Sequence, residues 1–372
     1  MKLLLGLMDR LRPTFEEGSL KALRPAFDAM DSFMFSVSHR TNIAPHVRDP
    51  NNMKRYMTAV ILAVMPVIAA AIYFFGWRVV GMIVVTYVTG LLIELAFAMA
   101  RKEEINEGFF VTGLLYPLIL PPNLPFWMVA VGIAFGVLVG KELFGGTGRN
   151  VFNPALVARC FLLIAYPVDM ARGWLVPASG IPGGFAKWSI DAVSQATPLG
   201  AAKSSGTYAD WWNLLFGTAS GNGVCGGCSG EVCSVLIILG GLFLIMTGVA
   251  NWRTIVSMLG SFAGLLAVLA WAAPATFGRA GWSVGELVAW QFLAGGLLFG
   301  AVYMATDPVT SPVSNLGKWF YGITIGVSTV LIRYLTGYVE GVMFAILLGN
   351  IAAPLYDEIA TWAYTRRLQH EG

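Results

Sequence analysis

Charged residues are scarce in this sequence. Only 12% of its 372 residues are Asp, Glu, Lys or Arg and 56% are hydrophobic, whereas about 25% charged residues are usual in soluble domains. This composition excludes an ordinary soluble globular protein and indicates a protein that resides in the lipid bilayer. The net charge of +3 is small and gives no reason to expect a nucleic-acid partner.

Two other features are missing. The Gly-rich stretches lie between apolar runs, so there is no soluble βαβ unit that could bind a dinucleotide. We therefore expect that the chain cannot take hydride from NADH without a partner. The first apolar run, residues 3–8, is short and is followed by Asp9 and Arg10. We expect no secretory signal here, and we expect the first membrane span to direct its own insertion.

The sequence does contain a series of long apolar runs. A membrane-spanning helix needs about 20 mainly apolar residues. Runs near this length, together with two shorter ones, predict an all-α polytopic membrane protein with about ten transmembrane helices. The long runs are 56–75, 79–99, 126–144, 232–246, 255–271, 284–304, 319–335 and 342–360, and the shorter ones are 109–120 and 152–166.

The basic residues predict the orientation of these spans. With a cytoplasmic N-terminus, most of the 24 Lys and Arg residues fall on the cytoplasmic side, as the positive-inside rule requires. We therefore expect a bacterial inner-membrane protein with both termini in the cytoplasm. Apolar residues at helical spacing in 20–34 predict an amphipathic helix on the membrane surface or against a partner. The expected divisions are a cytoplasmic extension (1–55), a first five-helix half (56–166), an outer loop (167–230), a second five-helix half (231–360) and a cytoplasmic tail (361–372).

The two membrane halves are weakly alike. Each contains a break rich in small and turn-forming residues, at 145–154 and at 305–312. Corresponding points of the halves are five spans apart, and this odd number predicts inverted halves with broken helices. Paired interruptions in inverted halves are typical of a pathway near the middle of the membrane.

A short polar motif lies in the outer loop, Ser194-Gln195-Ala196-Thr197-Pro198. The pattern Ser-x-Ala-Thr is typical of a site that accepts a flavin through a phosphoester, which would make this a redox protein. A threonine hydroxyl with no base beside it is a poor nucleophile, so a dedicated flavin transferase is required. Standing alone, the same residues would be read as an ordinary turn.

Several segments together carry a resemblance to a known family. They are residues 191–199, 145–150, 153–156, 305–309 and 353–357, within a similarity that extends from about residue 46 to residue 367. They resemble the family that comprises the B subunit of the sodium-translocating NADH:quinone oxidoreductase and the D subunit of the Rnf ferredoxin:NAD oxidoreductase. The N-terminal extension and the basic C-terminal tail favour the quinone oxidoreductase.

The resemblance implies a membrane subunit of a redox-driven sodium pump, a translocase. It implies that FMN is attached through its phosphate to Thr197, with Ser194 and Ala196 in the attachment motif. Gln195 stands where this family usually has glycine, and its side chain could restrict the loop. The implied partners are the other membrane, flavin and iron–sulfur subunits of the complex, the flavin transferase and the bilayer. Electrons would pass from a flavin on a neighbouring subunit toward ubiquinone, coupled to export of Na+.

A second, non-covalent flavin is also implied by the resemblance. Asn150 and Asn153 match the motif that this family associates with riboflavin near the cytoplasmic side, and their amides could bond to its ring edges. The alternative for the Asn-Pro pair is ordinary capping of a helix. Arg159 lies within a span and must have a polar partner, which could be a flavin or quinone oxygen or only a neighbouring carbonyl.

Carboxylates at membrane depth are the candidates for an ion pathway. Oxygen ligands suit a hard cation, and a charge inside the membrane is costly. Each such residue could instead be a helix-end carboxylate paired with Lys or Arg. Glu94 lies inside the second span, and four acidic residues fall in segments that match the family, whose acids there are implicated in sodium uptake: Glu107, Glu231, Asp307 and Asp357.

The cysteines are the main departure from the family. Cys225 and Cys228 form a Cys-x-x-Cys pair that is followed by Cys233. Outside the cytoplasm this pair could form a local disulfide, remain as free thiols, or bind a metal or an iron–sulfur cluster. No His follows Cys228, so attached c-type haem is not expected.

Other functions compete with the redox subunit of the quinone oxidoreductase. The chain could be the D subunit of an Rnf-type complex, or a non-redox channel or carrier of small solutes with a urea-transporter-like fold. It could also be a scaffold that binds redox partners without a cofactor. The carrier and the scaffold predict no flavin on the chain.

Overall fold

The structure is a computed structural model, and it describes residues 53–102, 108–178, 180, 182–190, 196–217, 227–279 and 281–371. Every element in these ranges is a helix, as the sequence predicts. The amphipathic helix predicted within residues 20–34 lies outside the described residues.

The first half contains five main helices. Asn153 caps the last of them by accepting a hydrogen bond from Ala155 N, and Pro154 takes the first helical position, where its missing N–H costs nothing. The helices are α3 (Met53–Phe75), α4 (Arg78–Arg101), α5 (Gly108–Leu118), α6 (Phe126–Gly140) with the short turn η2 (Glu142–Phe144), and α7 (Pro154–Ala165).

The second half repeats this pattern of helices, with its third member in two pieces. It consists of α11 (Ser234–Met246), α12 (Trp252–Ala272), the short α13 (Pro274–Phe277), α14 (Val284–Leu293), α15 (Leu297–Phe299) with the π-helix η4 (Gly300–Met304), α16 (Asn315–Leu335) and α17 (Val342–Glu371). The segment between the halves contains α8 (Pro167–Arg172), η3 (Gly183–Ala186), α9 (Pro198–Ser205) and α10 (Trp211–Phe216).

Nine of the ten predicted apolar runs each coincide with one main helix of the described chain, and the run 284–304 is divided between α14 and α15–η4. Five of these helices, α3, α4, α6, α12 and α17, are long and apolar enough to cross a membrane, and the bent pair formed by α14 and α15–η4 would be a sixth. Three further apolar helices, α5, α7 and α11, are shorter. The chain is therefore a multi-pass membrane protein, and the structure does not establish ten full crossings.

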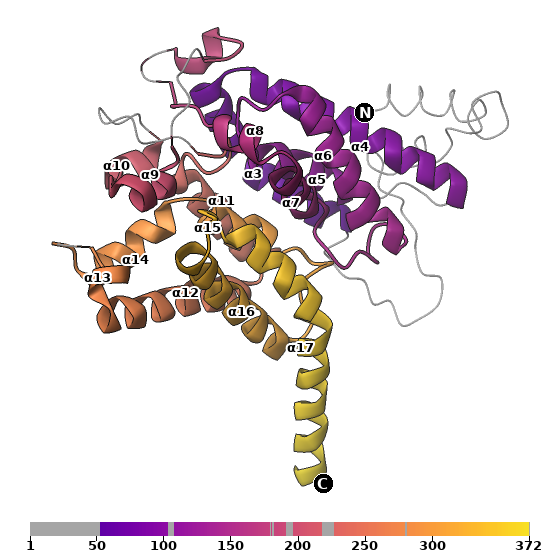
Figure 1. Ribbon diagram of the computed structural model, residues 1–372. Helices are drawn as coiled ribbons and strands as arrows, with labels where there is room; N and C mark the ends of the chain where they lie inside the picture. Colours follow the sequence, from indigo (N-terminus) through magenta and orange to yellow (C-terminus); the bar gives the residue numbers. More distant parts are fainter. Residues whose placement is uncertain are drawn as a thin grey trace.

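The two halves have the same internal packing. The first helix packs against the third, the second against the fourth, and the fourth against the fifth, in each half. Between the halves, α3 meets α11 and α7 meets α17, so first helix meets first and fifth meets fifth. This is the pattern expected for two repeats related by a two-fold axis. Figure 1 shows the first half in indigo and magenta above the second half in orange and yellow, with α17 projecting away toward the C-terminus.

The sharpest break in a helix occurs between α14 and α15. The sequence places 284–304 in one apolar run, but the two parts of this run differ in direction by 69°. Gly295 has a φ of +76°, a conformation that glycine adopts without strain. The buried guanidinium of Arg333 donates to Gln291 O at 3.0 Å and to Ala294 O at 3.4 Å, so it satisfies carbonyl groups that the break leaves without helical partners.

The segment that bears Thr197 is docked on the second half. Leu199 of α9 and Leu214 of α10 form a small apolar cluster with Trp290 of α14, and Trp290 Nε1 donates to Ala209 O at 2.9 Å. Lys203 Nζ donates to the carbonyl oxygens of Arg333 at 3.0 Å and Thr336 at 2.5 Å. A cation near these terminal carbonyls also complements the dipole of α16.

Candidate functional site

Thr197 lies at the first turn of α9. Its Oγ1 accepts a hydrogen bond from Gly200 N at 3.1 Å, which caps the helix. The residue is only 9% exposed, whereas Ala196 directly before it is exposed. Ser194 and Gln195 lie outside the described residues. The predicted flavin acceptor is therefore a buried N-cap at the point where an exposed segment enters the packed structure.

Asn150, Asn153 and Asp307 line one cleft between the two halves. It measures about 730 Å³ including its open mouth, and Tyr56, Lys141 and Tyr303 also line it. Both breaks predicted from the sequence, 145–154 and 305–312, contribute to its wall. Polar groups from both halves converge in an otherwise largely apolar cleft, which makes it a candidate site for a small molecule or cofactor.

The side chains of this cleft are partly engaged by their own loops. Asn150 Nδ2 donates to Phe152 O at 3.0 Å, and Asn150 Oδ1 accepts from Gly148 N at 3.2 Å. Asn153 Oδ1 caps α7, and its Nδ2 lies 3.7 Å from Met304 Sδ. An amide nitrogen carries two protons and an amide oxygen has two lone pairs, so both residues retain hydrogen-bonding capacity toward a ligand.

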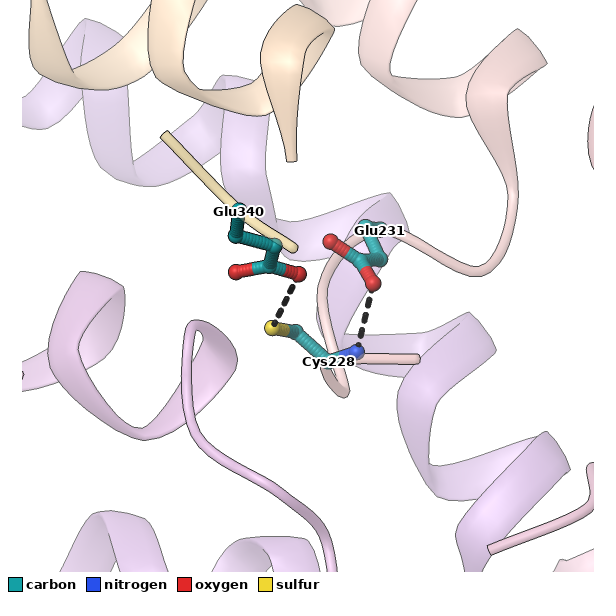
Figure 2. A group of neighbouring side chains, drawn as sticks. All are labelled: Cys228, Glu231 and Glu340. Carbon is teal, nitrogen blue, oxygen red and sulfur yellow. Dashed lines mark hydrogen bonds between the residues drawn. The ribbon is translucent and has the colours of Figure 1, made fainter. Parts of the chain in front are cut away.

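Arg159, Cys228, Glu231 and the half-buried Glu340 form a second group, which we call the thiol–acid cluster. Arg159 Nη2 pairs with Glu340 Oε2 and lies 3.3 Å from Cys228 Sγ. Cys228 N donates to Glu231 Oε1 at 2.9 Å, and Cys228 Sγ lies 3.9 Å from Glu340 Oε1 (Figure 2). The structure thus gives Arg159 a carboxylate and a thiol as partners, from segments far apart in the sequence.

The comparisons with known proteins place the chain in a family. The model of the NQR2, RnfD, RnfE family matches residues 40–364. The chain belongs to this family. Three relatives of this chain are each named as the B subunit of the Na(+)-translocating NADH-quinone reductase. That of Azotobacter vinelandii (strain DJ / ATCC BAA-1303) is 33% identical over 417 aligned positions, which cover 97% of both chains. That of Pseudomonas aeruginosa strain PAO1 is 34% identical over 425 positions covering 99% of both, and that of Yersinia pestis is 33% identical over 430 positions covering 98% of both.

Of the four acids that the resemblance to this family singles out, the three that the structure describes lie in different surroundings. Glu231 belongs to the thiol–acid cluster, and Asp307 lies in the cleft, where its Oδ2 accepts from Thr310 Oγ1 at 2.9 Å. Asp357 of α17 accepts from Val313 N and Ser314 N, both at 2.9 Å, and so supports the start of α16. Glu107 lies outside the described residues. The structure therefore does not bring the described acids into one site.

Glu231 also lies close to the segment that bears Thr197. A small cavity is lined by Glu231 together with Pro198, the residue after Thr197, and by Gly295 at the break of the bent helix. Glu231 therefore belongs to the thiol–acid cluster and also lines a cavity beside the first turn of α9.

Some polar residues of these sites could not be found from the sequence. Glu340 stands in a short loop between two apolar runs, and its pairing with Arg159 spans 181 positions. Lys141 is buried against Glu94 although the sequence places it with the cytoplasmic basic residues. In the structure Cys228 and Cys233 are free thiols, and Cys225 lies outside the described residues. The first of the three alternatives for the cysteine pair, a disulfide, is therefore not formed by Cys228.

Proposed function

We propose that this chain is the B subunit of a sodium-translocating NADH:quinone oxidoreductase of a bacterial inner membrane. In this role it carries FMN covalently on Thr197 and holds a non-covalent riboflavin, and it passes electrons toward ubiquinone in a process coupled to Na+ export. The observation that carries the proposal is the match over 97% or more of both chains to relatives that have this name.

The local structure around Thr197 supports the attachment of FMN. Thr197 begins α9, and a phosphate joined to its Oγ1 would lie at a helix N-terminus, where free N–H groups and the helix dipole favour negative charge. Gly200 helps to keep this site open, because a Cβ there would lie 3.1 Å from Thr197 Oγ1. A bound flavin supplies the electron chemistry, while the chain positions it and sets its electrostatic surroundings.

The cleft between the halves is the candidate riboflavin site. Asn150 and Asn153 present amide groups at its wall, and apolar side chains from α5, α11 and η4 form much of the remainder. This combination of an apolar lining with a few polar groups is typical of cofactor sites.

The acids at the interface of the halves are the candidate ligands for Na+ along its pathway. Asp307 lines the cleft, and Glu231 is buried beside the break in the second half. Moving one charge outward against 100 mV costs about 2.3 kcal/mol, which downhill electron transfer to a quinone can supply. The broken helix provides irregular backbone at an internal cavity, the setting in which transporters bind ions.

Attachment of the flavin is tested on the full chain produced together with a flavin transferase. After denaturing electrophoresis, we expect a band with flavin fluorescence that survives denaturation. Thr197→Ala should abolish the band. Thr197→Ser, which keeps a hydroxyl at the same position, should retain at least part of it, and Thr207→Ala in the following loop should leave it unchanged.

The competing functions predict different results in the same experiment. A solute carrier or a cofactor-free scaffold would give no fluorescent band from the wild-type chain. An Rnf-type protein would give the band, but the purified complex would then couple ferredoxin and NAD and would not reduce a quinone with NADH.

A further inference from the structure

The thiol–acid cluster brings together three side chains that can ligate a metal ion. One possible ligand atom from each of Cys228, Glu231 and Glu340 lies within 4.8 Å of the others. Cys228 and Glu231 come from the segment before α11, and Glu340 comes from the loop between α16 and α17. Figure 2 shows the three side chains directed toward a common point.

Glu231 provides an independent indication that this point receives a ligand. The residue is only 9% exposed, and its Oε1 accepts from Cys228 N. Its Oε2 is buried and has no hydrogen-bond partner in the part of the chain that the structure describes. Such an oxygen is costly to leave without a partner. In Figure 2 the Glu231 oxygen not bonded to Cys228 N faces the Glu340 carboxylate.

The space beside this oxygen is small and kept open by glycine. Arg159, Cys228, Glu231, Glu340 and Gly296 line one cavity of about 20 Å³. A Cβ on Gly296 would lie 3.2 Å from Glu231 Oε2, so a larger residue there would crowd the oxygen. About 10–15 Å³ is sufficient for one water molecule, so the cavity can hold a single ion or water and excludes an organic ligand.

The charges of the cluster match a divalent cation. A thiolate and two carboxylates carry three negative charges, and the guanidinium of Arg159 offsets one of them through its contacts with Glu340 and Cys228 Sγ. Two negative charges remain, and a divalent ion would neutralise them in a site where a net charge is costly. Arg159 would then act as an outer partner that orients both the thiolate and the Glu340 carboxylate.

The donor atoms select the class of ion. A thiolate is a soft ligand that favours zinc-like ions over Na+, Mg2+ or Ca2+, which prefer oxygen. One sulfur and two carboxylate oxygens fall within the ligand types of Zn2+, at about 2.3 Å and 2.0–2.2 Å from the metal. Three protein ligands would leave the fourth tetrahedral position to water.

We propose that Cys228, Glu231 and Glu340 form a binding site for a divalent transition-metal ion of the zinc class. The ion binds to Cys228 Sγ and to one oxygen of each carboxylate. The thiol proton is released to water, and no electrons are transferred. Because the ligand atoms are up to 4.8 Å apart, binding draws them together by about 1 Å to reach metal–ligand distances. The site uses neither a flavin nor a quinone, but it shares Glu231 with the proposed ion pathway, so a bound metal ion would occupy this carboxylate in place of Na+.

The experiment measures metal on the full chain, purified in its native complex. Elemental analysis gives zinc per chain, and Co2+ added to metal-depleted complex reports thiolate ligation through its sulfur-to-cobalt charge-transfer absorption. We expect about one zinc per chain above the background of a Cys228→Ser complex, and a cobalt–thiolate band in the wild type. Cys228→Ser and Glu231→Gln should each weaken Co2+ binding by more than about tenfold.

Cys233→Ser is the matched control. Cys233 lies near the cluster in the sequence, but its Sγ contacts Leu215 O at 3.5 Å, so this variant should bind Co2+ with unchanged affinity and the same band. The melting temperature of each variant checks that it is folded. If Cys228→Ser does not fold, the Co2+ affinity of Glu231→Gln tests the site instead. Zinc content and cobalt absorption unaffected by both variants, or wild type without a cobalt–thiolate band, would overturn the site and indicate that the two carboxyl groups share a proton instead.

Discussion

Two ion pairs join α4 to the end of α6, and they differ in how far water reaches them. Lys141 and Glu94 pair with side chains that are only 7% and 4% exposed. In the neighbouring pair, Arg101 and Glu142 are 2.8 Å apart, and the Arg101 side chain is 30% exposed. Removal of one member of a buried pair leaves an uncompensated charge, which costs far more than the same change at a solvated pair.

Glu94→Gln should therefore destabilise the protein strongly. Loss of the carboxylate leaves the Lys141 ammonium buried without its counter-ion, at a cost of about 3–5 kcal/mol. Glu142→Gln is the matched comparison. Because Arg101 stays partly hydrated, this variant should lose at most about 1 kcal/mol of folding stability. Melting temperatures in detergent would measure both. Equal decreases would show that Lys141 is not held as a buried charge, and Glu94→Gln with Lys141→Met should recover part of the stability.

The sequence indicates which single residues are unusual, but it does not indicate their partners. Arg159 and Glu94 are recognisable because a charge inside an apolar run demands a polar partner. Their partners, Glu340 and Lys141, stand 181 and 47 positions away, so only the tertiary packing identifies them. The burial of Thr197 was also not predicted, since a polar motif in a long loop gives no sign that a docked helix begins there.

Among the helices, the break between α14 and α15 links the docked segment to the membrane half. A Cβ at Gly295 would come closer to Leu199 Cδ1 than real side chains approach, and Arg333 Nη2 lies 3.4 Å from the same point. The left-handed glycine thus allows α9, with Thr197 at its start, to lie directly on the break. The sequence predicts the second interruption at 305–312, whereas the sharp bend lies upstream, because the apolar run 284–304 contains no proline or charged residue near Gly295 to mark it.

Gly295→Ala should impair both stability and flavin attachment. The positive φ alone costs a non-glycine residue about 1–2 kcal/mol, and the overlap with Leu199 adds to this and displaces α9. Gly206→Ala at the end of α9 is the control, because its φ is +64° and no atom lies within 4 Å of its added Cβ. We expect a lower melting temperature for both variants, and a reduced fluorescent band for Gly295→Ala alone. Fluorescent bands of equal intensity from the two variants would show that flavin attachment does not depend on the docking of α9.

Over the whole molecule, the cleft and the thiol–acid cluster both lie where the two halves meet. The cleft is lined by both interrupted segments, and the pair of Arg159 with Glu340 joins α7 of the first half to the loop before α17 of the second. The positions of all ten apolar runs could be predicted, since each run is long relative to its polar boundaries. The number of full crossings could not, because α5, α7 and α11 are shorter than a membrane span and their depth depends on their neighbours.

The predicted orientation is testable with a thiol reagent that does not cross membranes. Ser204→Cys in the exposed part of α9 should be labelled in intact cells, because the segment between the halves is expected on the outer face. Gln369→Cys near the end of α17, also exposed, should react only after the membrane is opened. The wild-type chain gives the background from its own cysteines. Labelling of Gln369→Cys in intact cells, alone or together with Ser204→Cys, would contradict the predicted cytoplasmic C-terminus.

The burial of Thr197 also bears on the order of events during biogenesis. In the folded chain its hydroxyl is engaged by Gly200 N and is 9% exposed, so a modifying enzyme has little access to it. If FMN is attached there as proposed, the modification would precede the closure of this segment onto the bundle, while the segment between the halves is still open. Closure would then shield the ester from hydrolases, and a chain that matured without its flavin would be a poor substrate for repair.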